Sequence, residues 1–210
     1  MDATLTNLDV SISLDDFVKF YLTLVSNSLN HLNIHSVNTS HVSVELATQL
    51  GYSCRDLKLL EYGSILHDIG KLFVPVEILN KSRRLSAAEF ELIKMHPVAG
   101  FEVLSKFASV PREISVLAIK HHYRHGFGYP AEAAEVNGID PVLVDILTVA
   151  DSFSAIMEPR VYKDKIVAEN AYGIMLDPAN VRNKGMSEYV LDALGFLIEK
   201  DKLFLSDFFV

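Results

Sequence analysis

Seven histidine and aspartate side chains in this chain have the types and spacing of metal ligands. Two pairs are adjacent, His67-Asp68 and His121-His122, and each pair stands where a helical pattern ends. Consecutive residues of a helix point about 100° apart, so one member of each pair must face the interior. Three further ligand types interrupt apolar patterns, namely His35, His96 and Asp151. A buried carboxylate or imidazole needs a partner, and a shared metal would provide one.

The seven residues are enough for two metal ions that share one carboxylate. A dinuclear hydrolytic site needs neutral imidazoles, a bridging carboxylate and an open position where water is activated. His67-Asp68 provides a ligand and the candidate bridge. One ion could be completed by His35 and Asp151, and the other by His96, His121 and His122. Imidazole with carboxylate suits Fe, Mn, Zn, Ni or Co, so the ligands alone do not select the metal. The sequence predicts a metal-dependent hydrolase.

Each of these residues has a structural alternative when it is considered alone. A single histidine on an apolar face, such as His35 or His96, is often a hydrogen-bonded core or surface residue. Asp68 could instead cap the loop at Gly70-Lys71. Asp151 is harder to explain in this way, because a carboxylate within an apolar helix needs a partner. The combination of all seven residues favours the metal centre.

The composition limits both the size of the fold and the class of partner. The chain has 210 residues, of which 50% are hydrophobic, and a formal net charge of -8. It can bury the core of one domain, or of one domain with a small helical annex. No run of Lys or Arg is long enough to follow a nucleic-acid backbone, so neither DNA nor RNA is expected as a partner. A small anionic ligand is compatible with this charge, because a local metal can override the global sign.

The sequence contains neither a recognisable targeting segment nor a membrane span. No basic stretch followed by an apolar run opens the chain, and no apolar run reaches the roughly 18 to 20 residues of a spanning helix. Cys54 is the only cysteine, so no intramolecular disulfide can form, and we expect its thiol to be half-buried in a reducing compartment. These features predict a soluble cytoplasmic protein without membrane insertion.

Apolar residues recur at helical spacing along most of the chain, and no segment alternates as a strand does. Helices are expected at residues 14–32, 37–50, 54–66, 86–104, 111–120, 142–157 and 189–198. Ser86 and Glu89 have the spacing of a capping box, which starts one of these helices. Residues 72–84 are expected to form a loop with at most one helical turn, and residues 123–138 a surface loop that could carry substrate contacts. The pattern predicts an all-α bundle.

Several sequence blocks follow one another in the order of a known family. HDIGK at residues 67–71 is followed by VPVEILNK, FELIKMHPVAGFEVL, the histidine doublet, GYP at 128–130, ILTVADSFSAI and RVYK at 160–163. In these blocks the chain resembles the HD-GYP family, a branch of the HD-domain phosphohydrolases that hydrolyses cyclic di-GMP. The resemblance implies an HD-domain helical bundle at residues 31–180. A lead-in and first helix would precede it at 1–30, and C-terminal helices at 181–210 would pack on the same domain.

The resemblance also implies a role for each matching position. One metal ion would have the ligands His35, His67, Asp68 and Asp151. Asp68 would bridge to a second ion, whose other ligands would be His96, His121 and His122. Lys71 would act with Asp68 in catalysis and stabilise charge beside the scissile phosphate. The phosphates of the dinucleotide would be contacted by Tyr129, Arg160 and Lys163. The ions would be Fe or Mn, with Zn, Ni and Co as alternatives, and the product would be pGpG, GMP or both.

This chain departs from the family pattern at several positions. Four residues before His35, where some members have a glutamate that supports a third metal, it has His31, and Asn38 replaces a usual arginine. The loop after the histidine doublet reads HHYRHGFGYP, which lacks the family's glutamate, has His125 in place of an aspartate and is one residue shorter. Asp145 replaces an arginine of the following helix. The metal ligands are retained, whereas the loop that lines the family's substrate pocket differs.

Two other functions are therefore compatible with the sequence. The altered loop could leave a metal-bearing but inactive module that binds a nucleotide or a partner protein in signalling. Alternatively, the centre could hydrolyse another nucleotide. Retention of Lys71, Arg160 and Lys163 favours the enzyme, because a purely structural metal centre does not need these cations. A cyclic dinucleotide is the expected substrate, and the resemblance also allows a signalling partner protein and a homodimer.

Overall fold

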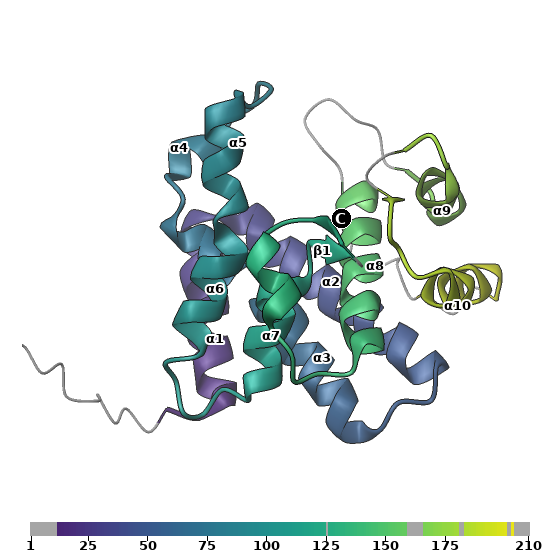
Figure 1. The fold of residues 1–210 in the computed structure, drawn as a ribbon, viewed down its shortest axis with the longest axis horizontal. Coiled ribbons are helices and arrows are strands. Elements are labelled where there is room, and N and C mark those ends of the chain that lie inside the picture. Colours follow the sequence, from purple (N-terminus) through teal and green to yellow (C-terminus); the bar gives the residue numbers. More distant parts are fainter. Residues whose placement is uncertain (1–11, 125, 159–165, 181–182, 201–202, 204–210) are drawn as a thin grey trace, which may run out of the picture.

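The computed structural model describes residues 12–124, 126–158, 166–180, 183–200 and 203 (Figure 1). These residues form a helical bundle with one short two-stranded hairpin. In chain order the elements are α1 (Leu14–Ser28), α2 (Asn30–Gln49), α3 (Cys54–Leu66), the 3-10 helix η1 (Ile69–Phe73), α4 (Val76–Leu79), α5 (Ala87–Lys94), α6 (His96–Leu104), α7 (Arg112–Lys120), β1 (Tyr123–Arg124), β2 (Phe127–Gly128), the 3-10 helix η2 (Ala131–Glu135), α8 (Pro141–Met157), α9 (Ala168–Leu176) and α10 (Glu188–Glu199). The predicted all-α class is confirmed.

Helix α8 packs against α2, and α9 and α10 lie on its side away from α5 (Figure 1). The side chain of Asp140 caps its N-terminus, and Pro141 suits its first turn, where no backbone N–H is needed. Most of its residues are apolar and buried, among them Leu147 and Phe153. Because the helix is apolar on nearly all faces, it carries Asp151 into the interior of the bundle.

The first helical segment is divided, unlike the helix predicted over residues 14–32. Helix α1 ends at Ser28, Leu29 leaves the helical region with φ −140° and ψ 56°, and α2 begins at Asn30. Helix α2 therefore starts earlier than the helix predicted over 37–50. Its buried residues include many polar ones, namely Ser36, Asn38, Thr39, Ser40 and Ser43. Because hydroxyls and an amide replace apolar residues on this face, apolar spacing does not mark the helix, and both predicted boundaries were wrong.

The helix predicted over residues 86–104 is two helices. Its capping box is confirmed, since Ser86 Oγ accepts from the backbone N–H of Glu89 and the Glu89 carboxylate accepts from the backbone N–H of Ser86. A second helix, α6, begins at His96 because Pro97 has no N–H to continue a helical ladder and fits only a first turn. His96 therefore stands at the start of a helix and not within one.

The segment predicted as a surface loop over residues 123–138 is more regular than expected. Residues 123–124 pair with residues 127–128 in an antiparallel hairpin, and η2 follows. Gly128 has φ 93°, and a Cβ there would lie 1.9 Å from the backbone oxygen of His122, so this turn requires glycine. Strands of two residues are too short to show alternation, which is why the apolar pattern does not predict them.

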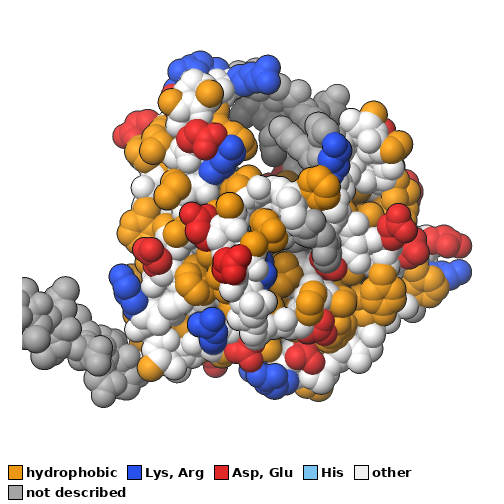
Figure 2. All heavy atoms as spheres, in the orientation of Figure 1, with side chains coloured by type: hydrophobic (Ala, Val, Ile, Leu, Met, Phe, Trp, Pro, Cys, Tyr) orange, Lys and Arg blue, Asp and Glu red, His pale blue; other side chains and the backbone are white. Residues whose placement is uncertain are grey.

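The exposed side chains are mixed in charge and include apolar ones. Figure 2 shows Lys and Arg side chains at the tip of the arm formed by α4 and α5, and a hollow in the surface beside that arm. Cys54, predicted to be half-buried, is exposed at the first position of α3. Among the described residues, no helix combines the length and the apolar character needed to cross a membrane.

Candidate metal centre

Helix ends bring three of the predicted ligands to one place. His67 follows the last residue of α3, His121 follows the last residue of α7, and His96 is the first residue of α6. The last carbonyls of a helix have no partner within it. Nδ1 of His67 donates to the carbonyl of Ser64 at 2.6 Å, and Nδ1 of His121 donates to that of Ala118 at 2.7 Å. Each ring is thereby held with Nε2 directed to the centre.

His96 uses the break between α5 and α6 in the same way. In a continuous helix the residue at position 97 would donate its N–H to the carbonyl of Ile93, but Pro97 has no N–H. Nδ1 of His96 donates to that carbonyl at 2.6 Å instead. The three histidines therefore share one arrangement, in which Nδ1 donates to a nearby backbone carbonyl and Nε2 remains available to a metal ion.

The carboxylate of Asp68 lies between the two predicted groups of ligands and is 1% exposed. Its Oδ1 is 3.1 Å from Nε2 of His96 and 3.8 Å from Nε2 of His121. Its Oδ2 is 3.4 Å from Nε2 of His67 and 3.9 Å from Nε2 of His35. The two oxygens of one carboxylate thus face different histidines, as a bridging carboxylate requires.

The first cluster joins α2, the end of α3 and α8. Nε2 of His35 lies 3.0 Å from Oδ1 of Asp151, and Nε2 of His67 lies 3.9 Å from the same oxygen. One ligand atom of each of these three residues lies within 4.8 Å of the others. Three elements that are distant in sequence therefore present two imidazoles and a carboxylate to one point.

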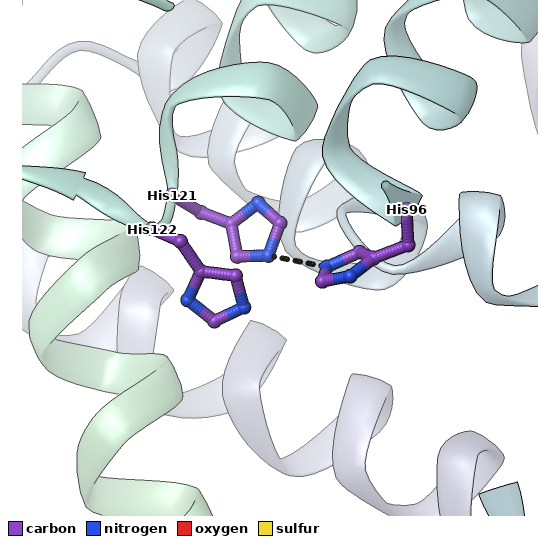
Figure 3. A group of neighbouring side chains, drawn as sticks. All are labelled: His96, His121 and His122. Carbon is purple, nitrogen blue, oxygen red and sulfur yellow. Dashed lines mark hydrogen bonds between the residues drawn. The ribbon is translucent and has the colours of Figure 1, made fainter. Parts of the chain in front are cut away.

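The second cluster consists of histidines alone (Figure 3). Nε2 of His96 and Nε2 of His121 are 3.2 Å apart, and the ring centroids of His121 and His122 are 4.1 Å apart. Nδ1 of His122 also lies 4.0 Å from Oδ2 of Asp151, so the two clusters adjoin. All seven predicted ligands are brought together.

Two buried atoms in this assembly have no hydrogen-bond partner among the described residues, namely Nε2 of His67 and Oδ1 of Asp68. An unsatisfied buried polar group costs about 1–3 kcal/mol. Both atoms face the centre, and both are of the types that bind divalent cations. The donor set therefore fits a metal, without distinguishing between Fe, Mn, Zn, Ni and Co.

The electrostatics of the centre keep several ligands in the forms that coordinate a metal. Burial lowers the pKa of His122 to about 3 and holds the pKa of His121 well below its usual value, so both rings are neutral at pH 7. Burial opposes the ionisation of Asp68, but the nearby charge of Lys71 and the interactions with His67 and His96 outweigh it and hold the pKa of Asp68 well below its usual range. Neutral imidazoles and ionised carboxylates are the metal-binding forms.

Lys71 contacts the candidate bridge from the side of the solvent. Its Nζ is 2.5 Å from Oδ2 of Asp68, and its side chain is 23% exposed. The neighbouring Gly70 allows η1 to lie directly on the start of α6, because a Cβ at Gly70 would be 1.9 Å from the backbone oxygen of His96. This close packing fixes the position of Lys71 relative to the second cluster.

Glu158 is a residue of the site that the sequence analysis did not identify. Its Oε1 accepts from Nδ1 of His35 at 2.7 Å. Burial opposes the charged ring of His35, but the hydrogen bonds to Asp151 and Glu158 outweigh it and raise the pKa of His35 to about 10. One signal could have indicated Glu158: it follows Asp151 by seven residues, which is two helical turns, so the two carboxylates share a face of α8.

A cavity of about 900 Å³ opens over the ligand cluster, a volume that suits a small-molecule ligand. Among its lining residues are the predicted Lys71 and Tyr129. The ring centroid of Tyr129 is 4.7 Å from that of His122. Arg124, which the sequence analysis did not assign to the site, also lines the cavity and donates from Nη2 to Oγ of Ser152 at 3.2 Å.

The remaining positions noted in the sequence are placed only in part. Arg160 and Lys163, both predicted substrate contacts, lie outside the described residues, as does His125. His31 lines the cavity one helical turn before His35. Within the part of the chain that the structure describes, His31 belongs neither to the two clusters nor to the third possible ligand group, which consists of His67, Asp68 and His121. Burial lowers its pKa.

A match to a protein-family model identifies the family of this chain. The model of the HD domain matches residues 20–183, a range that includes all seven predicted ligands. The chain belongs to the HD domain family. The predicted family and the predicted helical HD bundle are confirmed, and the HDIGK segment at residues 67–71 lies within the match.

Two relatives of this HD domain illustrate the similarity. The chain is 38% identical over 129 residues to the cyclic di-GMP phosphodiesterase response regulator RpfG of Xanthomonas campestris pv. campestris, a match that covers 60% of this chain and 33% of that protein. It is 34% identical over 140 residues to a cyclic di-GMP phosphodiesterase of Thermotoga maritima, covering 66% of this chain and 38% of that protein. The match therefore spans 33% and 38% of the length of these two relatives.

A solved structure shows the same fold. The HD domain of the L. monocytogenes phosphodiesterase PgpH superposes with a TM-score of 0.61 and 18% sequence identity. The superposition covers 87% of this chain and 97% of that chain. At this level of identity the likeness concerns the fold alone, and it agrees with the helical bundle described above.

Proposed function

We propose that this HD domain is a metal-dependent phosphodiesterase that hydrolyses cyclic di-GMP to pGpG, GMP or both. The observation that carries the proposal is the position of Asp68. Its two oxygens face histidines of different clusters, and Lys71 contacts Oδ2 at the wall of a cavity of about 900 Å³. The names of the two relatives support the choice of substrate, since both are cyclic di-GMP phosphodiesterases.

The two clusters would hold two divalent ions, with Fe or Mn preferred and Zn, Ni or Co as alternatives. One ion would be held by His35, His67, Asp68 and Asp151. The other would be held by Asp68, His96, His121 and His122. Such ions supply Lewis-acid activation of a phosphoryl oxygen and of the attacking water. The orphaned Nε2 of His67 and Oδ1 of Asp68 support this assignment, because metal ligation would satisfy both atoms.

Lys71 would stabilise the negative charge that develops on the phosphoryl group. The contact between its Nζ and Oδ2 of Asp68 holds the ammonium group at the edge of the centre. A cation in a partly buried site acts more strongly on a developing charge than it would in water. Asp68 would therefore have two roles, as the bridge between the ions and as the group that positions Lys71.

The substrate would be held by residues around the cavity. Tyr129 lines it beside His122, and Arg124 lines it from β1. Burial lowers the pKa of Arg124, but arginine remains charged at neutral pH in proteins. A guanidinium group suits the phosphate of a dinucleotide because it can donate two parallel hydrogen bonds. We propose that Arg124 contacts a phosphate together with Arg160 and Lys163.

A second candidate function is a module that binds a cyclic dinucleotide without turnover. The altered hairpin favours it, because Arg124 and Phe127 of this segment line the cavity and form part of the wall that would face a substrate. A signalling partner protein and a homodimer belong to the same proposal. Binding without product would assign the chain to this class.

The test is turnover of cyclic di-GMP by protein purified without oxygen and loaded with Fe(II) or Mn(II). Products are separated by chromatography, and Asp68→Ala protein serves as the blank. We expect pGpG or GMP only from the intact centre. Cyclic di-AMP and a mixed guanine-adenine cyclic dinucleotide in the same assay separate another nucleotide substrate from cyclic di-GMP. Protein that holds two metal ions and binds cyclic di-GMP in equilibrium dialysis, yet gives no product, would refute the enzyme.

A further inference from the structure

His35 differs from His67, His96 and His121 in the hydrogen-bond partner of its Nδ1 atom. Nδ1 of His67, His96 and His121 donates in each case to a neutral backbone carbonyl three residues earlier. Nδ1 of His35 donates instead to the carboxylate of Glu158, 123 residues later in the chain, at 2.7 Å. The Nδ1 atom of His35 therefore hydrogen-bonds an anionic partner, and that partner comes from another helix.

The position of Glu158 is fixed by the end of α8. It is the C-cap residue of this helix, and its backbone N–H donates to the carbonyl of Ser154 at 3.0 Å. Its side chain is 20% exposed and that of His35 is 10% exposed, so the contact is largely shielded from water. Asp151 lies two turns earlier on the same face. His35 is thus held between two carboxylates of α8, with Asp151 at Nε2 and Glu158 at Nδ1.

We propose that Glu158 is a positioning residue of the metal centre, which holds the proton of His35 on Nδ1 and directs Nε2 to the ion shared with His67 and Asp151. A carboxylate behind a metal-bound imidazole fixes the tautomer and the ring orientation, and it makes the ring a stronger donor. The inference rests on the proposed metal centre but not on the substrate. The two metal positions would then differ in the partner behind an imidazole ligand. In the first cluster Nδ1 of His35 donates to a carboxylate, whereas in the second cluster Nδ1 of His96 and Nδ1 of His121 donate to neutral carbonyls.

The alternative is that Glu158 is itself a ligand. Its Oε1 is engaged by Nδ1 of His35. Within the described part of the chain, Glu158 is absent from all three groups of side chains that could hold a metal. The geometry therefore favours an indirect role through His35, and the number of ions bound distinguishes the two roles.

The experiment compares Glu158→Ala and Glu158→Gln with the wild type. Metal-free protein is titrated with Co(II), and binding is followed by the visible absorption of the ion and by equilibrium dialysis with metal analysis. Asp145→Asn is the matched control, because this substitution removes one charge from the same helix. Asp145 lines a different, smaller cavity. Circular dichroism checks that each variant is folded.

We expect Glu158→Ala to lower the affinity for one of two Co(II) ions by roughly 10- to 100-fold, which is the usual effect of losing such a partner. The affinity for the other ion should not change. Glu158→Gln should lower the affinity for the same ion by a smaller factor, because its amide oxygen can still accept from Nδ1. In Zn(II)-loaded protein, the ¹⁵N NMR shift of Nδ1 of His35 should move in both variants. Asp145→Asn should bind both ions as the wild type does.

Four results would overturn the inference. Wild-type affinity for both ions in Glu158→Ala would show that the contact does not matter. Loss of a whole third ion, with the other affinities unchanged, would make Glu158 a ligand. An equal loss of affinity for both ions in the folded Glu158→Gln variant would indicate a general effect of charge. A wild-type protein that binds no Co(II) would remove the metal centre itself. Because turnover is not measured, a failure to hydrolyse cyclic di-GMP would leave this inference standing.

Discussion

Oδ1 of Asp68 lies 3.1 Å from Nε2 of His96, although the two residues stand at the ends of different helices. The other oxygen of the same carboxylate faces Nε2 of His67 at 3.4 Å and is contacted by Lys71. One buried side chain therefore connects both histidine clusters with the nearby cation. This relationship makes Asp68 the position at which the proposed centre is most sensitive to substitution.

Replacing Asp68 with alanine should remove both metal ions and all turnover together, because each ion would lose the shared ligand. Metal content per chain, measured by mass spectrometry after dialysis, checks the first expectation. Asp68→Asn, which preserves the volume, controls for packing, and Asp192→Ala controls for the loss of an exposed carboxylate on α10. A folded Asp68→Ala protein with the metal content of the wild type would show that Asp68 is not a bridge.

Lys71→Ala should keep both ions while kcat falls on the order of 10²-fold or more, the scale of losing one group that stabilises charge in a transition state. The reason is that Lys71 contacts Asp68 but donates no lone pair to a metal. Lys58→Ala, at an exposed lysine on α3, is the control. Steady-state kinetics and metal analysis on the same sample separate the two effects. Unchanged kcat in Lys71→Ala would remove this residue from the mechanism.

Gly70→Ala should destabilise the fold by about 3 kcal/mol or more, because overpacking against backbone cannot be relieved by a side-chain rotation. The added Cβ would lie 1.9 Å from the backbone oxygen of His96 and 2.7 Å from the backbone nitrogen of Gly100. Urea denaturation of metal-free protein measures the change in the free energy of unfolding. The metal content should fall as well, because His96 must shift.

A glycine elsewhere provides the contrast for this substitution. Gly173 lies within α9, and a Cβ there would meet no heavy atom within 4 Å. Gly173→Ala should therefore be neutral or stabilising by up to about 1 kcal/mol, through helix propensity alone. If both substitutions had the same effect, the close packing of η1 on α6 would not be the cause.

The positions of the ligands could be predicted because helix ends are visible in the sequence. His67 and His121 stand at the ends of apolar helical patterns. His96 was expected within a helix, and only the structure places it at the start of α6, before Pro97. The helix ends also supply carbonyls that orient these rings, as the hydrogen bonds of His67 and His121 show. The structure brings the seven residues together, while their role in binding a metal stays a prediction.

The features that were missed depend on tertiary packing. The start of α2 could not be located, because buried polar residues such as Ser36 and Thr39 replace the apolar residues that mark other helices. The spacing of Glu158 from Asp151 places both carboxylates on one face of α8, but it does not name a partner. That partner, His35, is 123 residues away, and the two meet only when α2 packs on α8. Arg124 likewise lines the cavity only through the fold of the hairpin.

The capping box of α5 should make stability depend on pH. Hydrogen bonds from Lys81 and from the backbone of Ser86 lower the pKa of Glu89 from 4.5 to about 2. A carboxyl group whose pKa is lower in the folded state stabilises the protein above its unfolded pKa, and this stabilisation is lost as the pH falls through its folded pKa. The contribution of Glu89 should therefore be complete above about pH 4.5 and disappear towards pH 2.

The Glu89→Gln variant has no carboxyl group at this position to titrate, so a comparison with the wild type measures the contribution of Glu89 directly. Urea midpoints of metal-free wild type and variant should differ at pH 7, and the difference should narrow as the pH falls from 4.5 to about 2. Glu91→Gln, an exposed position on the same helix, controls for the change in net charge. A difference that is independent of pH would mean that the Glu89 charge does not support the start of α5.

Arg124→Ala should raise KM for cyclic di-GMP by on the order of 10- to 100-fold with a smaller change in kcat. A hydrogen bond to a charged group contributes about 1.5–3 kcal/mol, and a contact that binds substrate and transition state equally changes KM alone. The expectation follows from the position of Arg124, which lines the cavity beside Tyr129 and bonds Ser152 on α8. Ser152→Ala removes this bond and retains the guanidinium, so its effect on KM should be smaller. Equal KM values for the wild type and Arg124→Ala would exclude Arg124 from substrate binding.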